Sequence, residues 1–280
     1  MPQEPRHAKR HSFASSFMMH YLTLGEMALT NRMREATMTL VSAVRRLLHA
    51  VLPLQCANCE VPLNGDPVPF FCRACWDSIQ PLRGPFCPCC GRPFASSCAL
   101  EYSPDHVCGA CRSHHPAYTR AWSLYPYASP IREAVHLFKY NKKVALANAL
   151  GALMDRAPIE TVSVDVIIPV PLSPGRLRNR EYNQSLLLAD RLSQAKNIPF
   201  SYDNLVRTRE TTPQTELSRA VRLKNLRRAF AVRRPQDMTG KRVLVIDDVF
   251  TTGTTVNECA KALRKAGASE VYVCTLARTV

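Results

Sequence analysis

The sequence predicts an α/β domain with a mainly parallel sheet, preceded by a small cysteine-rich module. Two observations lead to this prediction. Ten of the twelve cysteines lie between Cys56 and Cys111, and the other two are Cys259 and Cys274. After Pro116, short apolar runs alternate with segments of helical periodicity, which is the pattern of strand–helix–strand units in a parallel sheet.

The overall composition limits the class of protein. Of the 280 residues 46% are hydrophobic, which is enough apolar material for a folded core. The 37 Lys and Arg outnumber the 22 Asp and Glu and leave a net charge of +15. This charge favours anionic partners such as nucleic acids, phosphorylated small molecules or an anionic membrane surface. We find no convincing secretory signal and no run of about 18 uncharged apolar residues, so we expect no membrane span and a cytoplasmic location.

The N-terminal residues 1–37 are polar, basic and rich in methionine. We expect a disordered basic tail here; a nucleic-acid-binding arm and an upstream start codon chosen in error are the alternatives. Residues 38–53 place Leu40, Val44 and Leu47 at helical spacing, and Pro53 follows. This spacing predicts an amphipathic helix that ends at the proline.

The cysteine-rich module, residues 54–116, contains four Cys-x-x-Cys pairs. These pairs are Cys56 with Cys59, Cys72 with Cys75, Cys87 with Cys90, and Cys108 with Cys111. The two thiolates of a pair can face one ion, and two pairs complete the tetrahedron that Zn²⁺ prefers. Four pairs therefore predict a double zinc ribbon with two structural zinc sites, since four thiolates leave no open position for catalysis. Sequential pairing is the simplest arrangement; crossed pairing, disulfides and an iron–sulfur cluster are alternatives, and Cys89 and Cys98 are left over.

The predicted α/β domain, residues 117–280, alternates strands and helices along the chain. Strands are predicted at 121–127, 164–170, 243–246 and 271–276, and helices at 131–140, 144–154, 183–196, 217–230 and 257–266. The runs at 164–170 and 243–246 are continuously apolar, as expected of parallel strands that are buried on both faces.

The most informative segment, Val243 to Thr255, reads VLVIDDVFTTGTT. An apolar strand delivers Asp247 and Asp248 to its carboxyl end, and four threonines around Gly253 lead into a helix. Backbone N–H groups at a helix N-terminus, with hydroxyl groups around them, form a site for a phosphate monoester. Because carboxylates repel phosphate, the aspartates must face sugar hydroxyls, Mg²⁺ or both. Plain helix capping by the threonines is the alternative.

This segment resembles the phosphoribosyl pyrophosphate (PRPP) signature of type I phosphoribosyltransferases. Further motifs, in the same order along the chain, resemble the ComF family and its gluconate-utilisation relatives (GntX), in which a double zinc ribbon precedes a phosphoribosyltransferase domain. These motifs are Pro169-Val-Pro171, Arg176 to Arg180, Tyr182-Asn183-Gln184, Thr212-Pro213-Gln214 and Leu217-Ser218-Arg219. One departure is Glu181, which stands where the family usually has glycine and adds a negative charge near the predicted anion site.

The resemblance implies a type I phosphoribosyltransferase fold that binds PRPP together with Mg²⁺. The two aspartates, Asp247 and Asp248, are then the catalytic pair that holds the ribose 2- and 3-hydroxyls. The remaining residues expected to bind PRPP are Val170, Pro171, Thr251, Thr252, Gly253, Thr254, Thr255, Arg207, Arg219, Arg222 and Lys139. Among these, the threonine loop holds the 5-phosphate and the Val170–Pro171 turn faces the pyrophosphate.

A strongly basic segment between Arg207 and Arg234 holds nine Lys or Arg and only two acids. Guanidinium groups match phosphate oxygens, so Arg207, Arg219 and Arg222 are the candidate pyrophosphate ligands. A strip for the backbone of single-stranded nucleic acid and a solvated helix face are the alternatives.

Two functions follow from these features. The first is a Mg²⁺-dependent phosphoribosyltransferase of nucleoside metabolism, whose acceptor the sequence does not identify. The second, implied by the family, is a protein that handles single-stranded DNA during DNA uptake in competence, next to a helicase-like partner. In that case PRPP is a regulatory ligand, or the site is a relic.

Overall fold

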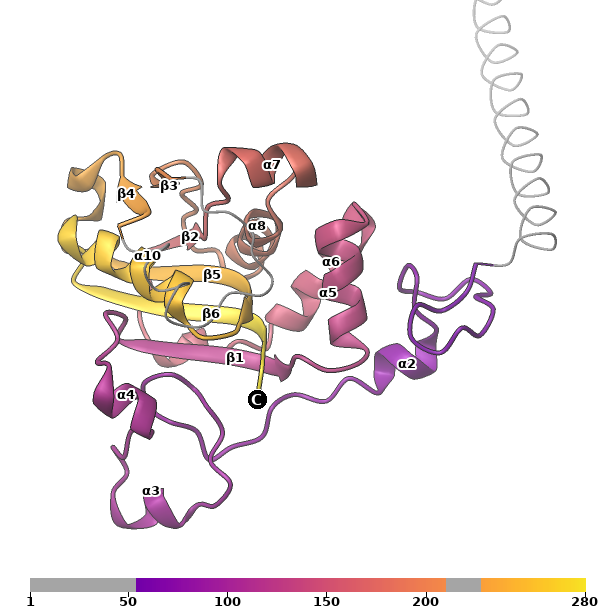
Figure 1. Ribbon diagram of the computed structural model, residues 1–280, viewed down its shortest axis with the longest axis horizontal. Helices are drawn as coiled ribbons and strands as arrows, with labels where there is room; N and C mark the ends of the chain where they lie inside the picture. Colours follow the sequence, from indigo (N-terminus) through magenta and orange to yellow (C-terminus); the bar gives the residue numbers. More distant parts are fainter. Residues whose placement is uncertain (1–53, 210–227) are drawn as a thin grey trace, which may run out of the picture. The chain divides into compact units, whose positions relative to one another are not determined.

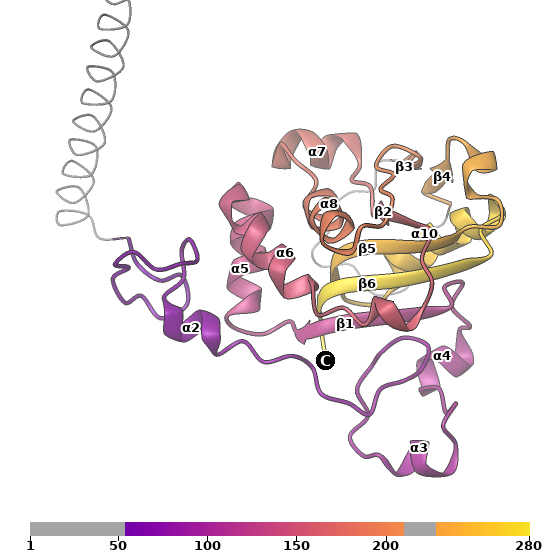
Figure 2. The ribbon, with the colours of Figure 1, turned by 180° about the vertical axis from the view of Figure 1, so that it is seen from behind.

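The computed structural model describes residues 54–209 and 228–280 (Figures 1 and 2). The predicted tail at 1–37, the predicted helix at 38–53 and most of the predicted helix at 217–230 lie outside these residues. The segment Gln55–Val280 forms one compact unit. Within the described ranges no helix is long and apolar enough to cross a membrane.

A four-stranded parallel sheet forms the framework of the C-terminal domain. Its strand order is β1-β6-β5-β2. The strands are β1 (Arg120–Pro126), β2 (Val166–Pro169), β5 (Arg242–Phe250) and β6 (Glu270–Arg278). All three pairings are parallel, so the predicted α/β fold with a mainly parallel sheet is confirmed.

Side chains of the sheet alternate between two separate cores, as expected from the two-residue period of a strand. On one face Leu244 and Ile246 pack with α5 (Ile131–Tyr140), α6 (Ala147–Met154) and α8 (Gln184–Lys196). On the other face Val243 and Val245 pack with α10 (Thr254–Lys265) and with cysteines of the second ribbon. Figures 1 and 2 show these helices on opposite faces of the sheet.

The predicted elements differ from the structure mainly at their ends. The predicted helix at 144–154 is a 3₁₀ turn, η1 (Val144–Leu146), followed by α6. The predicted strand at 243–246 continues to Phe250, because its pairing with β6 extends to Arg278. Both aspartates therefore lie inside β5 rather than after it.

The predicted helix at 217–230 is wrong at its last residue. Phe230 begins strand β4 (Phe230–Val232), which pairs antiparallel with β3 (Leu205–Arg207). Helix α7 (Pro174–Arg180) and the 3₁₀ turns η2 (Ile159–Thr161) and η3 (Pro235–Met238) were not predicted.

The cysteine-rich module contains three helices of five residues each. They are α2 (Arg73–Asp77), α3 (Cys98–Tyr102) and α4 (Gly109–Ser113). A tight turn encloses the first cysteine pair of each ribbon, closed by hydrogen bonds such as Cys56 N to Val61 O at 2.9 Å and Cys87 N to Arg92 O at 2.8 Å. In the first ribbon the rings of Phe71 and Trp76 lie 5.4 Å apart.

Candidate functional site

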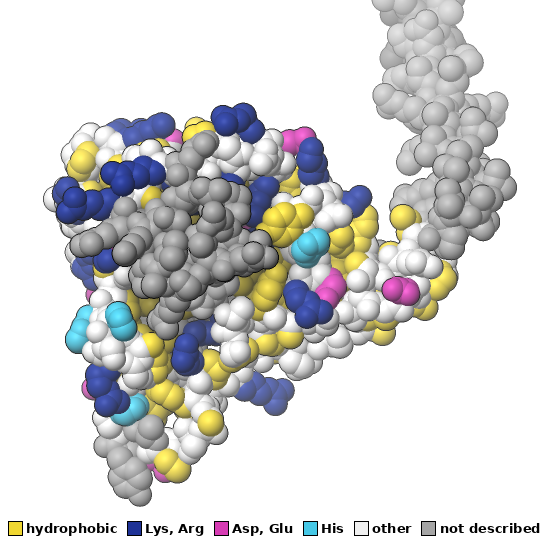
Figure 3. Space-filling model, in the orientation of Figure 1, with side chains coloured by type: hydrophobic (Ala, Val, Ile, Leu, Met, Phe, Trp, Pro, Cys, Tyr) yellow, Lys and Arg dark blue, Asp and Glu magenta, His cyan; other side chains and the backbone are white. Residues whose placement is uncertain are grey.

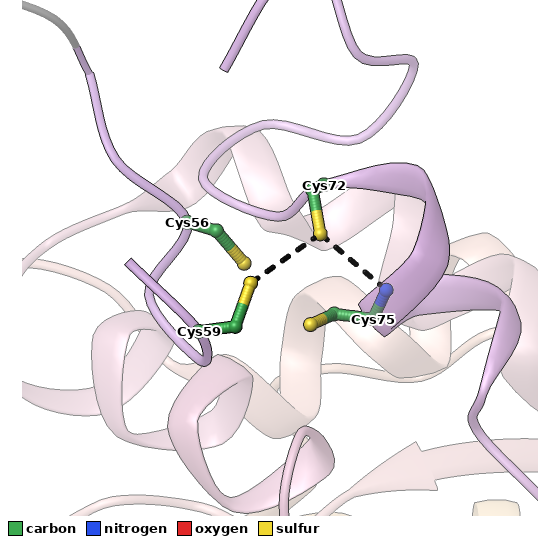
Figure 4. Close-up of side chains that lie close together, drawn as sticks. All are labelled: Cys56, Cys59, Cys72 and Cys75. Atoms are coloured by element: carbon green, nitrogen blue, oxygen red, sulfur yellow. Dashed lines mark hydrogen bonds between the residues drawn. The ribbon is translucent and has the colours of Figure 1, made fainter. Parts of the chain in front are cut away.

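The eight cysteines of the four predicted pairs form two groups. One group is Cys56, Cys59, Cys72 and Cys75; the other is Cys87, Cys90, Cys108 and Cys111. In each group the sulfur atoms all lie within 4.8 Å of one another. Figure 4 shows the four side chains of the first group pointing toward a common centre. The pairs therefore combine in sequential order, and the crossed pairing is wrong.

The sulfur geometry fits tetrahedral zinc. The Sγ atoms of Cys59 and Cys72 lie 3.7 Å apart, and so do those of Cys90 and Cys108. A tetrahedron with Zn–S bonds of about 2.3 Å has edges of about 3.8 Å. Burial and the neighbouring Cys90 raise the pKa of the Cys111 thiol, so four thiolates at this place need a cation among them. Both groups are therefore suited to structural Zn²⁺.

The four cysteines without a predicted metal role lie outside both groups. Cys89 and Cys98 belong to neither. Cys259 and Cys274 are fully buried in the α/β domain, as small apolar side chains, and burial raises the pKa of Cys274 to about 12. Within the described residues, which include all twelve cysteines, none forms a disulfide.

The predicted phosphate loop lies between β5 and α10. Helix α10 begins at Thr254, and its N-cap is Gly253, whose φ of 74° is in the left-handed region that glycine favours. A Cβ atom at this position would lie 2.5 Å from Cζ of Phe250. The hydroxyls of Thr252 and Thr254 are 2.9 Å apart, and Thr251 and Thr252 are exposed. The loop is therefore compact at its glycine and open to solvent at its first two threonines.

The two aspartates of β5 have different partners. Asp248 is buried, and its Oδ1 lies 2.7 Å from Nζ of Lys139. Asp247 accepts hydrogen bonds from Ser185 Oγ at 2.9 Å and from the backbone N of Asp248 at 3.0 Å. Burial and the neighbouring charge of Asp248 raise the pKa of Asp247 above its usual range. Burial lowers the pKa of Lys139, but the attraction of Asp248 outweighs it and raises that pKa overall.

The Tyr182-Asn183-Gln184 motif holds this arrangement together. Tyr182 Oη and Gln184 Nε2 both donate to the backbone oxygen of Phe138, the residue before Lys139. Asn183 caps α8 by accepting from Ser185 N, and its Nδ2 donates to Val170 O at 3.0 Å. The motif thus fixes the Val170–Pro171 turn and the end of α5 relative to β5.

Arginines from two elements interact electrostatically with Asp247. Burial and repulsion by Arg176 lower the pKa of Arg207, and the charge of Asp247 opposes this shift. Burial and repulsion by Arg180 likewise lower the pKa of Arg176 in α7, and the charge of Asp247 opposes this shift. Arg180 Nη1 donates to Gln184 Oε1 at 3.0 Å. Of the predicted ligands, Lys139 contacts Asp248 and the charge of Arg207 interacts with that of Asp247, whereas Arg219 and Arg222 lie outside the described residues.

Sequence reasoning did not include Arg176, Arg180 or Ser185 among the ligands. The available signal for the two arginines was their place in the Arg176–Arg180 motif, directly after the Val170–Pro171 turn. Arg234, which contributed to the count of basic residues, forms ion pairs with Asp203 and Asp237 and so has a structural role.

Glu181, which stands where the family usually has glycine, adopts a backbone conformation that glycine favours. It caps α7 with a φ of 68°, in the left-handed region. Its carboxylate forms an exposed ion pair with Lys142. A cation thus accompanies the extra negative charge.

Comparisons with known proteins agree with this architecture. The double zinc ribbon domain matches residues 47–115, and the phosphoribosyl transferase domain matches residues 182–279. The chain is 32% identical over 222 residues to the DNA utilization protein YhgH of Escherichia coli (strain K12), an alignment that covers 74% of this chain and 97% of that protein. It is 32% identical over 228 residues to Competence protein F of Haemophilus influenzae (79% of this chain, 93% of the relative). It is 27% identical over 218 residues to Competence protein ComFC of Bacillus subtilis (74% and 84%).

Two four-cysteine groups precede a parallel sheet that carries the Asp-Asp and threonine-loop segment, and the relatives in Escherichia coli and Haemophilus influenzae align over nearly their whole length. The chain therefore belongs to the ComF family of double zinc ribbon and phosphoribosyltransferase-domain proteins.

Proposed function

We propose that this protein binds PRPP with Mg²⁺ at the carboxyl ends of β2 and β5, in a cytoplasmic role linked to competence and DNA uptake. The observation that carries the proposal is the threonine loop at the N-terminus of α10, directly after the two aspartates of β5. Ligands of open parallel sheets bind at this edge.

The charges of the site support an anionic sugar phosphate. The loop offers backbone N–H groups and hydroxyls for the 5-phosphate. Arg176 and Arg207, both near Asp247, supply guanidinium groups for the pyrophosphate. Asp247 and Asp248 are suited to the ribose hydroxyls, and Mg²⁺ would bind pyrophosphate oxygens while it keeps several waters.

The Lys139–Asp248 ion pair adds a constraint on binding. Asp248 already has a cation at 2.7 Å, so a sugar hydroxyl must share this carboxylate with Lys139 or displace it. We expect Lys139 to turn toward the pyrophosphate when PRPP binds. This would place a third positive charge on the leaving group of a transfer reaction.

Calorimetric titration with PRPP and Mg²⁺ tests the proposal. The Asp247→Asn/Asp248→Asn double variant should lose binding, while Asp105→Asn, on the exposed surface of the second ribbon, should retain it. Saturation at about 100 times the dissociation constant should stabilise the fold by about 2.7 kcal/mol. If neither heat nor a shift in melting temperature is observed for the wild type, the protein does not bind PRPP. Release of pyrophosphate with a panel of nucleobases then tests transfer itself.

A role in handling single-stranded DNA is the second candidate. The names of the relatives refer to DNA utilization and competence. Figure 3 shows Lys and Arg side chains gathered on the face that carries β4 and α7, and Arg209, Arg228 and Arg233 are exposed. A helicase-like partner belongs to the same proposal. Affinity for a labelled oligonucleotide should fall steeply with salt, by about tenfold or more between roughly 50 and 200 mM. Binding that does not change with salt would exclude this basic surface.

A further inference from the structure

The last residue of β6 is one of the contacts between the second zinc ribbon and the α/β domain. Arg278 is 2% exposed, and its Nη1 donates a hydrogen bond to the backbone oxygen of Cys90 at 2.8 Å. Cys90 is one of the four cysteines of the second group. Four thiolates around one Zn²⁺ carry an excess of negative charge, and a buried guanidinium keeps its positive charge. Arg278 is therefore a buried cation close to the second metal site.

The same guanidinium lies against the phosphate loop. Its Cζ is 5.0 Å from the centroid of the Phe250 ring, and the two residues are register partners in β6 and β5. Phe250 is the last residue before Thr251. Its ring fills the space beside Gly253, where even one added carbon would lie 2.5 Å from the ring. The position of the ring and the conformation of the loop therefore depend on each other.

Two more contacts connect the end of the module to the same loop and helix. The ring of Tyr118 lies edge-to-face with Phe250 at 6.4 Å. The backbone N of Ala117 donates to Asn257 Oδ1, in the first turn of α10, at 2.7 Å. The chain that leaves the second ribbon is thus attached to both sides of the phosphate loop.

The first ribbon contacts a different part of the domain. Lys143, which follows α5, lies over the ring of Phe70 at 5.0 Å. This contact is separate from Arg278 and Phe250. The two ribbons have the same predicted ligands but different neighbours, so each serves as a control for the other.

We propose that Arg278 is a positioning residue that couples the second zinc site to the phosphate loop, so that zinc in the second ribbon strengthens PRPP binding. This inference rests on the proposed PRPP function and adds regulation of the same site. Guanidinium and phenyl ring act as one packed unit: loss of the metal frees the Cys90 backbone, and Arg278 and Phe250 then lose their fixed positions. Coupling is reciprocal, so PRPP raises the zinc affinity of the second site by the same factor.

Removal of one zinc ligand from each ribbon of the full-length protein tests the coupling. Cys111→Ser and Cys75→Ser should each lower the zinc content by one equivalent, measured by elemental analysis. Calorimetric titration with PRPP and Mg²⁺ should show binding weakened about tenfold in Cys111→Ser and changed less than about twofold in Cys75→Ser. Equal loss in both variants, or no loss in either, overturns the coupling while the PRPP site itself stands. A wild type that does not bind PRPP overturns both proposals.

Arg278→Met and Phe250→Leu test the coupling with both zinc sites intact. Both should keep two zincs and a native circular dichroism spectrum but bind PRPP about tenfold more weakly. In chelator competition, PRPP should raise the zinc affinity of one site in the wild type and of neither site in Arg278→Met. The coupling is wrong if PRPP leaves the zinc affinity of the wild type unchanged. Should Arg278→Met fail to fold, this wild-type competition and Phe250→Leu decide the question.

Discussion

The cysteine-rich module and the α/β domain hold their folds by different means. Among the described residues of the module, the buried apolar side chains are Leu63, Phe71 and six cysteines of the two groups. These eight residues belong to the same two cores that cover both faces of the sheet, in which the α/β domain supplies most of the side chains. The module thus has little apolar core of its own and depends on its metal sites, whereas the α/β domain supports a charged site on a full apolar core.

Zinc removal is the strongest way to separate the two regions. Structural zinc contributes about 10–16 kcal/mol of binding free energy, which is folding free energy for a module with so little core of its own. A chelator should therefore unfold the module and make its thiols reactive to a thiol reagent. Cys259 and Cys274 should stay protected, because both are fully buried in the α/β domain.

The control for this measurement is the same reagent in denaturant, where all twelve cysteines should react. If Cys259 and Cys274 react as fast as the zinc-site cysteines after chelation, the α/β domain also depends on metal for its fold. The difference between the two regions would then disappear.

A smaller effect is expected from the charge inside the α/β domain. The pKa of Asp247 is raised in the folded state, so stability is lost as pH rises from the unfolded pKa toward the folded one. Asp247→Asn removes this cost and should raise the folding stability at pH 8. The gain should be only about 1 kcal/mol, because Asp247 is partly exposed and solvent screens its charge. The gain should be smaller at pH 4.5.

Melting curves of Asp247→Asn at the two pH values, beside Asp105→Asn, check this expectation. A gain that is equal at both pH values would show that burial of the charge is not its cause. The variant should also bind PRPP more weakly, so that added stability comes with lost function.

The two regions also differed in how far the sequence predicted them. Zinc ligands were predictable one by one, because a thiolate pair at x-x spacing needs only its local turn to face a metal. The helix at 131–140 was predicted at its observed ends, since its apolar spacing is regular. The position of the two aspartates within β5 was not, because the strand continues as far as its pairing with β6.

The parts of the site that were missed depend on distant contacts. Ser185 reaches Asp247 across 62 positions, and Arg278 reaches Cys90 across 188. No local pattern distinguishes such a serine from a cap, or such an arginine from a surface residue. Lys139 was predicted as a PRPP ligand, but its pairing with Asp248 could be identified only from the fold.

The smallest expected effect comes from left-handed backbone strain, which occurs at a glutamate in each of the two regions. Glu60, after the first cysteine pair, has a φ of 62°, and Glu181 has a φ of 68°. Glycine at either position removes the strain of a left-handed backbone but also gives the unfolded chain more conformational freedom. The net gain in folding stability should be about 0.5–1 kcal/mol. For Glu181→Gly the gain should raise the melting temperature, reduced in part by loss of the exposed Lys142 ion pair. For Glu60→Gly it should appear as tighter zinc retention against a chelator, because metal binding and folding are one equilibrium in the module. The alanine variants keep the Cβ and should show neither gain; equal gains with alanine would assign the effect to the lost charge.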